Sequence, residues 1–314
     1  MLKTLIVMAN VSLSNAKRAK NDEFYTQLSD IENELKHYKS HFAGKVVYCN
    51  CDDARKSNFF RFFQKKFNDY GLKKLITTSY NENGHGSVLV YEGDTNGNGK
   101  LDDSEIKVSE LKGNGDFRSE ECIELLKEAD IVVTNPPFSL FREYIATLVQ
   151  YNKKFLVIGN QNAITYKEIF PLIKENKVWT GNNMVKAFRV PQVTNKNCEV
   201  LPNGDIIAKF GSICWFTNLD IKKRHEEIIL YKSYNEEEFP KYDNYDAIEV
   251  SKVCEIPKDY DGVMGVPITF LYRYNPSQFE IVGCANHGTD NKYDLCKPTI
   301  KGKLIYKRLL IKRK

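Results

Sequence analysis

An asparagine, two prolines and a phenylalanine follow the most strand-like stretch of this chain. Within residues 129–141, the β-branched run at 131–133 predicts a buried strand. Asn135 follows the strand, and Pro136 and Pro137 have no N–H with which to continue a sheet ladder. Because a residue before proline is held in extended conformations, Asn135 is predicted at the carboxyl end of a parallel strand, where open α/β sheets bind their ligands.

These residue types suit the binding of a planar amine. The Asn135 side-chain oxygen and the Pro136 carbonyl are two acceptors held rigid by the proline backbone, and each can take one amine hydrogen. Phe138 offers a face on which a planar ring can stack. The alternative interpretation is structural, namely a strand followed by a Pro-Pro turn and a packed phenylalanine.

The segments around this motif alternate between strand and helix patterns, which predicts a doubly wound α/β sheet. Strands are predicted over residues 45–53, 74–78, 131–133 and 154–160, and helices over 57–70, 122–129 and 141–151. Phenylalanines recur at four-residue spacing in the first of these helices, and we interpret them as core. Residues 21–27 open a further helical pattern through Ile31, Leu35 and Tyr38.

Polar side chains also stand where the first two strands end. Asn50, Asp52 and Asp53 close the first strand, at the position where a nucleotide-type cofactor sits in such sheets. No Gly-x-Gly loop follows, which departs from the usual pattern. Glu82, after the second strand, is placed to reach ribose hydroxyls or is an ordinary loop charge.

Residues 94–105 satisfy the EF-hand loop pattern at every prescribed position. An EF-hand also needs flanking helices, whereas residues 87–91 and 106–108 alternate as strands do. Asn-Gly pairs are in addition the commonest hairpin turns. We therefore expect a hairpin excursion and no metal site, with a calcium-regulated protein as the alternative.

Composition describes an ordinary globular protein of 314 residues with 42% hydrophobic and 28% charged residues. Eight scattered cysteines favour a reduced, cytoplasmic protein over a disulfide framework. No apolar run approaches the roughly 18 residues of a membrane helix. We expect translation to start at Met1 or Met8.

The net charge of +5 is concentrated at one end of the chain. Residues 297–314 hold eight Lys or Arg and no acid, so the remainder carries 38 basic and 41 acidic residues. Such a tail fits a polyanionic partner or is a solvated terminus. Residues 179–260 mix Asn, Lys, Arg and aromatics, the side-chain types that read base edges and phosphates.

The motif at residues 135–138 resembles motif IV of amino-group methyltransferases that use S-adenosylmethionine, and residues 24–26 look like their motif X. More of the chain is similar to the EcoRI-type adenine-N6 DNA methyltransferases. The matching segments, in order, are residues 21–27, 46–53, 115–118, 130–141, 241–247 and 262–271. The resemblance runs from about residue 21 to the end of the chain.

This resemblance implies a Rossmann-like class I sheet and methylation of an adenine flipped out of duplex DNA. The adenine amine is a poor nucleophile because its lone pair is delocalised, and acceptors on both its hydrogens localise that pair. Catalysis then falls to Asn135, Pro136, Pro137 and Phe138. Binding of S-adenosylmethionine falls to Tyr25, Thr26, Asn50, Asp52, Asp53, Glu82, Asp116 and Phe117, with Asp116 expected at the end of the third strand.

We expect four segments along the chain. These are an N-terminal extension (1–20), the S-adenosylmethionine-binding and catalytic domain (21–178), a target-recognition region (179–260), and C-terminal strands with a basic tail packing on the catalytic domain (261–314). The expected protein is a monomer that acts on double-stranded DNA, separately from a cognate restriction endonuclease and without a membrane. Methylation of RNA or of a cytosine amine, and a non-catalytic DNA-binding module, are the alternatives.

Overall fold

The computed structural model describes residues 25–51, 56–99, 102–190, 193, 197–285 and 297–314. The chain forms two compact units, each built from two stretches of sequence. Unit 1 comprises Met1–Asn160 and Asn183–Leu219, and unit 2 comprises Gln161–Asn182 and Asp220–Lys314.

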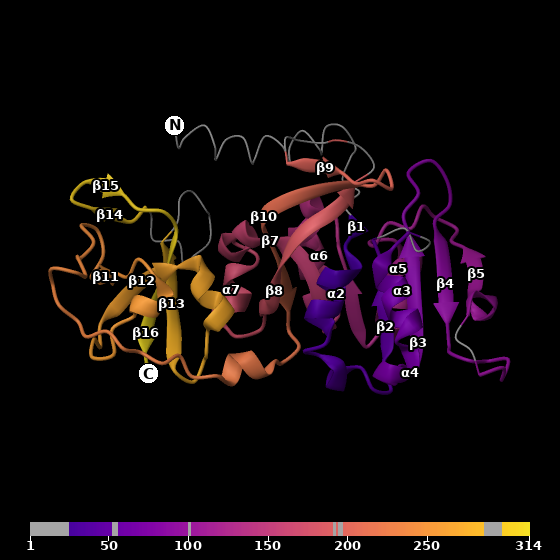
Figure 1. Cartoon of the computed structure of the whole chain (residues 1–314), viewed down its shortest axis with the longest axis horizontal. Helices are drawn as coiled ribbons and strands as arrows, with labels where there is room; N and C mark the ends of the chain where they lie inside the picture. The colour runs from indigo at the N-terminus through magenta and orange to yellow at the C-terminus, as the bar shows by residue number, and fades with distance from the viewer. Residues whose placement is uncertain (1–24, 52–55, 100–101, 191–192, 194–196, 286–296) are drawn as a thin grey trace. The chain divides into compact units, whose positions relative to one another are not determined.

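A ten-stranded sheet carries unit 1 (Figure 1). Its strands, in chain order, are β1 (Tyr25–Thr26), β2 (Val46–Cys49), β3 (Lys74–Ser79), β4 (Ser87–Tyr91), β5 (Lys107–Glu110), β6 (Ile131–Thr134), β7 (Lys154–Asn160), β8 (Trp179–Val190), β9 (Cys198–Val200) and β10 (Ile206–Thr217). Their order across the sheet is β1-β8-β10-β7-β6-β2-β3-β4-β5, with β9 paired to β10. The middle strands β7, β6, β2 and β3 are parallel, whereas β4, β5 and β10 join antiparallel.

The helices of unit 1 begin and end at residues suited to those positions. They are α2 (Leu28–Leu35), α3 (Asn58–Lys65), α4 (Phe67–Tyr70), α5 (Glu120–Glu128) and α6 (Phe141–Gln150), with 3-10 turns η1 (Lys39–His41), η2 (Asp103–Glu105) and η3 (Phe138–Leu140). The Ser57 and Ser119 side chains accept backbone N–H groups at the starts of α3 and α5. Gly71 ends α4 in the left-handed conformation, with φ of 62°.

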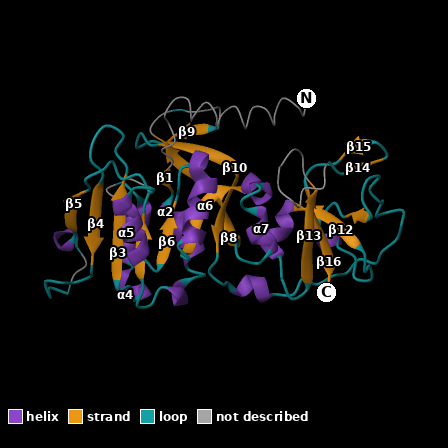
Figure 2. Ribbon diagram, turned by 180° about the vertical axis from the view of Figure 1, so that it is seen from behind, coloured by secondary structure: helices purple, strands orange, loops and turns teal. Residues whose placement is uncertain are grey.

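Helices cover both faces of the sheet. Trp215 and Phe216 are consecutive on β10, so their side chains point to opposite faces. The Phe59 ring of α3 lies 6.0 Å from the Trp215 ring, and the Phe141 ring of α6 lies 5.1 Å from the Phe216 ring. Helices α3 and α6 therefore pack on opposite sides, as a doubly wound sheet requires; Figure 2 shows the strands and helices from behind.

Unit 2 contains a smaller four-stranded sheet in the order β11-β12-β16-β13. Its strands are β11 (Ala247–Glu249), β12 (Val263–Pro267), β13 (Phe279–Ala285) and β16 (Arg308–Arg313), and β14 (Thr299–Ile300) and β15 (Lys303–Leu304) form a separate hairpin. Its helical segments are η4 (Gln161–Thr165), α7 (Phe170–Lys174), η5 (Lys222–His225), η6 (Val253–Glu255) and η7 (Ile268–Arg273). The buried Glu249 carboxylate pairs with Arg308 at 2.6 Å and also accepts the Tyr242 hydroxyl.

Most predicted elements are confirmed, including the strands around residues 45–53, 74–78, 131–133 and 154–160 and the hairpin that replaces an EF-hand. The phenylalanines of α3 and Phe67 are buried, as expected for core. No helix among the described residues is long and apolar enough to cross a membrane.

Two expectations about local structure are wrong. Tyr25 and Thr26 do not open a helix but form β1, because Gln27 is extended and the helix starts only at Leu28. Asp116 does not end a parallel third strand. The hairpin β4–β5 occupies that place in the sheet, and Asp116 lies in the loop between β5 and α5.

The compact units also differ from the predicted segment boundaries at residues 178 and 260. Residues 183–219 belong to unit 1 because β10 pairs with β7 and extends the large sheet. Residues 261–314 share unit 2 with residues 220–260. The assignment of residues 179–260 to target recognition stays a prediction.

Candidate functional site

Asn135 stands at the carboxyl end of β6, as its position before two prolines predicts. The strand is buried along its whole length, and the Thr134 hydroxyl donates to the Asn50 carbonyl at the end of β2. Asn135 itself is 9% exposed, and Pro136 beside it is buried. An asparagine at the edge of a parallel sheet is thus set in a largely dehydrated place, where its hydrogen bonds are stronger than in water.

Asn50 occupies the equivalent end of the neighbouring parallel strand β2. It is 3% exposed, and its side-chain oxygen accepts the hydroxyl of Tyr144 from α6. Burial raises the pKa of Tyr144 well above its usual value, so the hydroxyl stays protonated and remains a donor. The Asn50 side chain is therefore oriented by helix α6, which follows residues 135–138 in the sequence.

The short strand β1 contributes a polar group that the described protein leaves unsatisfied. Thr26 is 1% exposed, pairs with Phe188 of β8, and receives the Asn58 side-chain amide on its carbonyl at 2.7 Å. Its hydroxyl oxygen is buried and has no hydrogen-bond partner among the described residues. A buried hydroxyl without a partner is unfavourable, so a polar ligand group fits this position.

Phe138 connects the motif to the same region. It begins η3, is half-buried, and its ring meets the Phe188 ring nearly edge-on with 6.3 Å between centroids. Phe188 on β8 pairs with Thr26 on β1. Phe138 and Thr26 therefore both contact the same residue of β8. Tyr25 lies beside them, with the Arg189 guanidinium 5.5 Å from its ring centre.

Asp116 and Phe117 both make contacts within the protein, Asp116 with Arg118 and Phe117 with Tyr144. Hydrogen bonds from Arg118 to the Asp116 carboxylate, at 2.6 and 2.9 Å, hold the pKa of that carboxyl below its usual value. Arg118 also reaches Glu143 of α6. Phe117 is 5% exposed and packs edge-on against Tyr144, with 5.0 Å between ring centres.

Glu82 lies in the exposed loop between β3 and β4, next to the loop that carries Asp116. The Asn81 amide donates to the Asn114 carbonyl, and a Cβ added at Gly115 would meet the Ser79 carbonyl at 2.1 Å. The two loops are therefore in direct backbone contact. Asp52 and Asp53 lie outside the described residues.

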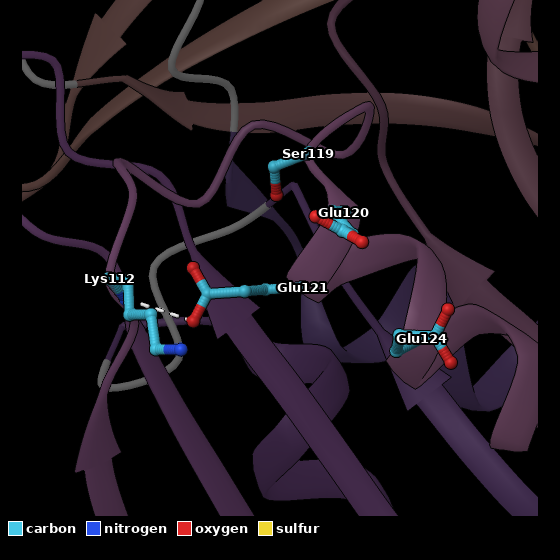
Figure 3. Close-up of a pocket in the computed structure, with 5 residues that line it drawn as sticks. All are labelled: Lys112, Ser119, Glu120, Glu121 and Glu124. Carbon is cyan, nitrogen blue, oxygen red and sulfur yellow. Dashed lines mark hydrogen bonds between the residues drawn. The ribbon is translucent and has the colours of Figure 1, made fainter.

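A surface hollow near this loop is not lined by any predicted site residue. The hollow has a volume of about 460 Å³. The residues that line it are Lys112, Ser119, Glu120, Glu121 and Glu124, shown in Figure 3. The Glu121 carboxylate accepts the backbone amides of Lys112 and Gly113, both at 2.9 Å. The remaining carboxylates give the hollow a charge that repels a polyanion.

The loop that matches the EF-hand pattern satisfies many of its own oxygens. Asp94 accepts the amides of Asn98 and Gly99, and the buried Glu105 accepts the amide of Thr95 at 2.6 Å. Asp102 caps η2. No cluster of metal-ligating side chains is found among the described residues.

Sequence reasoning missed Tyr144 and Phe188, the two aromatics that tie the site together. Tyr144 looks like any buried position of the amphipathic helix α6, and only its pairing with Asn50 distinguishes it. Phe188 lies 162 residues from Thr26 in sequence, and no local signal predicts that their strands pair.

Comparison with known proteins shows which family this chain resembles. The family model described as "Adenine-specific methyltransferase EcoRI" matches residues 12–314. The Type II methyltransferase M.EcoRI of Escherichia coli is 51% identical over 321 residues, covering 97% of each chain. Type II methyltransferases of Mycoplasma genitalium (M.MgeORF184P) and Mycoplasma pneumoniae (M.MpnI) are 45% and 44% identical, each covering 86% of this chain and 85% of the relative.

Proposed function

Because this chain belongs to the family of EcoRI-type adenine-specific methyltransferases, we propose that it methylates the exocyclic amine of adenine in duplex DNA, with S-adenosylmethionine as donor. The observation that carries the proposal is the position of Asn135. This side chain is 9% exposed at the carboxyl end of β6 and is followed by two prolines and Phe138.

Asn135 and Pro136 hold the amine. The Asn135 side-chain oxygen and the Pro136 carbonyl each accept one amine hydrogen, which localises the nitrogen lone pair for attack. Pro136 and Pro137 fix the backbone so that these acceptors need no reorganisation during the reaction. Phe138 stacks on the base, which has to leave the double helix to reach this position.

S-adenosylmethionine supplies a methyl group made electrophilic by a positively charged sulfur. Thr26 provides the buried hydroxyl that fits a polar group of this molecule, and we assign Tyr25 on β1 and Asn50 at the end of β2 to the same site. We assign the rest of the cofactor site to Asp52, Asp53, Glu82, Asp116 and Phe117. Asp116 keeps acceptor capacity on Oδ2, which accepts one bond from Arg118, whereas Oδ1 accepts two, from the Arg118 amide and Nε.

The relatives carry the designation Type II methyltransferase, and we propose the same role for this chain, as the modification half of a restriction-modification system. It then acts as a monomer and separately from any endonuclease, with residues 179–260 reading the target. A DNA substrate agrees with the cytoplasmic location that the scattered cysteines favour.

The test is methyl transfer from labelled S-adenosylmethionine to unmethylated genomic DNA, with single-molecule sequencing of the product. Modified adenine within one short sequence is the expected result. Label in RNA or in cytosine instead would overturn the proposed substrate.

Asn135→Ala tests the role of the motif. We expect kcat to fall at least about 100-fold, because a fixed acceptor is lost where charge develops. Asn68→Ala, an exposed asparagine on α4, is the matched control and should leave kcat unchanged. Near-normal turnover in a folded Asn135→Ala protein would refute the mechanism.

A further inference from the structure

The basic C-terminal region is not a featureless tail but begins with a tight hairpin in unit 2. Strand β14 pairs with β15 through Thr299↔Leu304 and Ile300↔Lys303, which leaves Lys301 and Gly302 as a two-residue turn. Both turn residues have positive φ, 49° and 71°, as two-residue hairpin turns require. Figure 1 shows this hairpin beyond one end of the four-stranded sheet of unit 2.

The lysines in the hairpin and just before it, Lys297, Lys301 and Lys303, are exposed and make no ion pair among the described residues. Arg308, by contrast, is neutralised by the buried Glu249. Exposed Tyr306, 53% accessible, lies at the base of the same hairpin.

Two side chains from a distant part of unit 2 hold the hairpin in place. The Asp243 carboxylate accepts the amides of Lys301 and Gly302 at 2.9 and 2.8 Å, and these bonds lower the pKa of Asp243. Asn244 accepts the Thr299 amide at 3.1 Å and donates to the Lys297 carbonyl at 2.6 Å. A two-stranded hairpin is marginally stable alone, so its geometry depends on these bonds together with the Asp243 amide, which donates to the Thr299 carbonyl at 2.8 Å, and the packing of Ile300 against the core of unit 2.

The residue at the tip is unusual for its conformation. Turns of this kind favour Asn, Asp or Gly at the first position, because other side chains are strained at positive φ. Lys301 occupies it nevertheless, with its amide held by Asp243. Strain that the surroundings maintain is typical of positions kept for function, and what lysine adds here is a charge at the most projecting point.

We propose that the β14–β15 hairpin contacts the phosphate backbone of duplex DNA through Lys301 and Lys303, and that Asp243 and Asn244 position it. The proposal rests on the proposed function for the identity of the polyanion. Lysine is a compact point charge suited to phosphate, and contacts of this kind fix a protein on DNA without reading its sequence.

The first test removes the charge without disturbing the turn. In Lys301→Asn/Lys303→Gln, asparagine suits the left-handed position better than lysine does. We expect the Kd for a cognate duplex and for an unrelated duplex to rise together, about 10-fold or more at 0.1 M salt. The slope of log Kobs against log[salt] should become less steep by about two phosphate contacts.

The matched control is Lys65→Gln/Lys73→Gln. These two exposed lysines also lack ion pairs among the described residues and lie at the amino-terminal side of β3, away from the carboxyl ends of the strands. The net charge change is the same, so an equal loss of affinity in the control would overturn the proposal. A loss confined to one DNA sequence would also overturn it, since phosphate contacts are shared by all sequences.

The second test separates positioning from charge. Asp243→Ala removes a negative charge, so bulk electrostatics alone predicts tighter DNA binding, whereas loss of the positioning bonds predicts weaker binding. We expect the Kd for DNA to rise several-fold in Asp243→Ala and to recover only in part in Asp243→Asn, which has the same charge as alanine but keeps one of the two acceptor oxygens. Glu237→Ala, an exposed acid, is the charge-matched control and should not weaken binding.

Both tests read DNA binding directly and do not depend on methyl transfer. Wild-type protein that methylates DNA while the hairpin variants bind as tightly as wild type would overturn the hairpin proposal and leave the enzyme assignment intact. Wild-type protein that binds DNA through the hairpin without methylating it would support the hairpin and overturn the proposed function.

Discussion

At the scale of single residues, Thr26 distinguishes a ligand site from ordinary packing. Its hydroxyl is buried and unsatisfied by the described protein, whereas the equally buried Thr217 donates to the Phe155 carbonyl at 2.6 Å and accepts the Leu219 amide. Removing the hydroxyl is therefore expected to lower ligand affinity at Thr26 and to lower the stability of the fold at Thr217, although both residues are equally buried.

Thr26→Val keeps the shape of the side chain and deletes only the hydroxyl. We expect the affinity for S-adenosylmethionine to fall by roughly 10-fold while the melting temperature stays level or rises, since no internal hydrogen bond is lost. Titration calorimetry and thermal unfolding measure the two quantities.

Thr217→Val is the control for this substitution. It should lose about 1–3 kcal/mol of stability, because two internal hydrogen bonds disappear, and keep the cofactor affinity of the wild type. Wild-type affinity in Thr26→Val would remove this residue from the cofactor site.

The sequence predicts the position or contacts of a single residue only where their cause lies in neighbouring residues. The position of Asn135 follows from the strand before it and the prolines after it, and both lie within a few residues. The engagement of Asp116 does not follow in the same way. The partner of Asp116, Arg118, is two residues away in the sequence. Arg118 also pairs with Glu143 of helix α6, which the local sequence does not predict.

At the scale of elements, the site depends on two loops whose backbones touch. Gly115 has φ of 82°, and a Cβ there would lie 2.1 Å from the Ser79 carbonyl oxygen. Gly86, on the neighbouring loop, would meet the same carbonyl at 2.6 Å. No side chain fits between the loops, so glycine is required for contact and not only for conformation.

Gly115→Ala is expected to separate these loops. It should destabilise the protein by several kcal/mol and weaken cofactor binding, because Asp116 and Phe117 shift with the loop. Gly204→Ala is the matched control, since Gly204 has nearly the same φ, 85°, and open space around it.

The control should cost only the conformational penalty, about 1–2 kcal/mol. Denaturant unfolding of both variants measures the difference. Equal destabilisation would mean that the close approach between the loops contributes nothing.

The sequence predicted those strands that contain a continuous run of apolar residues. Strands β2, β3, β6 and β7 are short, buried and rich in β-branched residues. Strands β8 and β10 are twelve residues long with mixed burial, and β8 also contains several polar residues, so neither shows a regular pattern along its whole length. Their place in the sheet comes from pairing with segments far away, which a local pattern does not contain.

At the scale of the whole molecule, buried tyrosines couple unfolding to alkaline pH. Burial is the main cause that raises the pKa of Tyr70 and of Tyr91 to about 12, with Asp69 and Glu105 adding to it. A folded pKa above the usual value of 10 means that the stabilisation is complete below pH 10. It is lost as pH rises toward 12.

We therefore expect the free energy of unfolding to decline between pH 10 and pH 12. Chemical unfolding monitored across this range measures the decline, and it should be shallower in Tyr91→Phe, which has no proton to lose. An identical pH profile in that variant would exclude Tyr91 as a contributor.

The division of the chain between the two units also sets an order in time. The chain passes from one unit to the other between Asn160 and Gln161, between Asn182 and Asn183, and between Leu219 and Asp220. During synthesis the large sheet lacks β8 until residue 190 and β10 until residue 217 has been made, although Asn135 was added long before. Thr26 in turn waits for Phe188 as its pairing partner. A ribosome-bound fragment that ends before β8 therefore carries the catalytic motif without the sheet edge beside it, and we expect such a fragment not to methylate DNA.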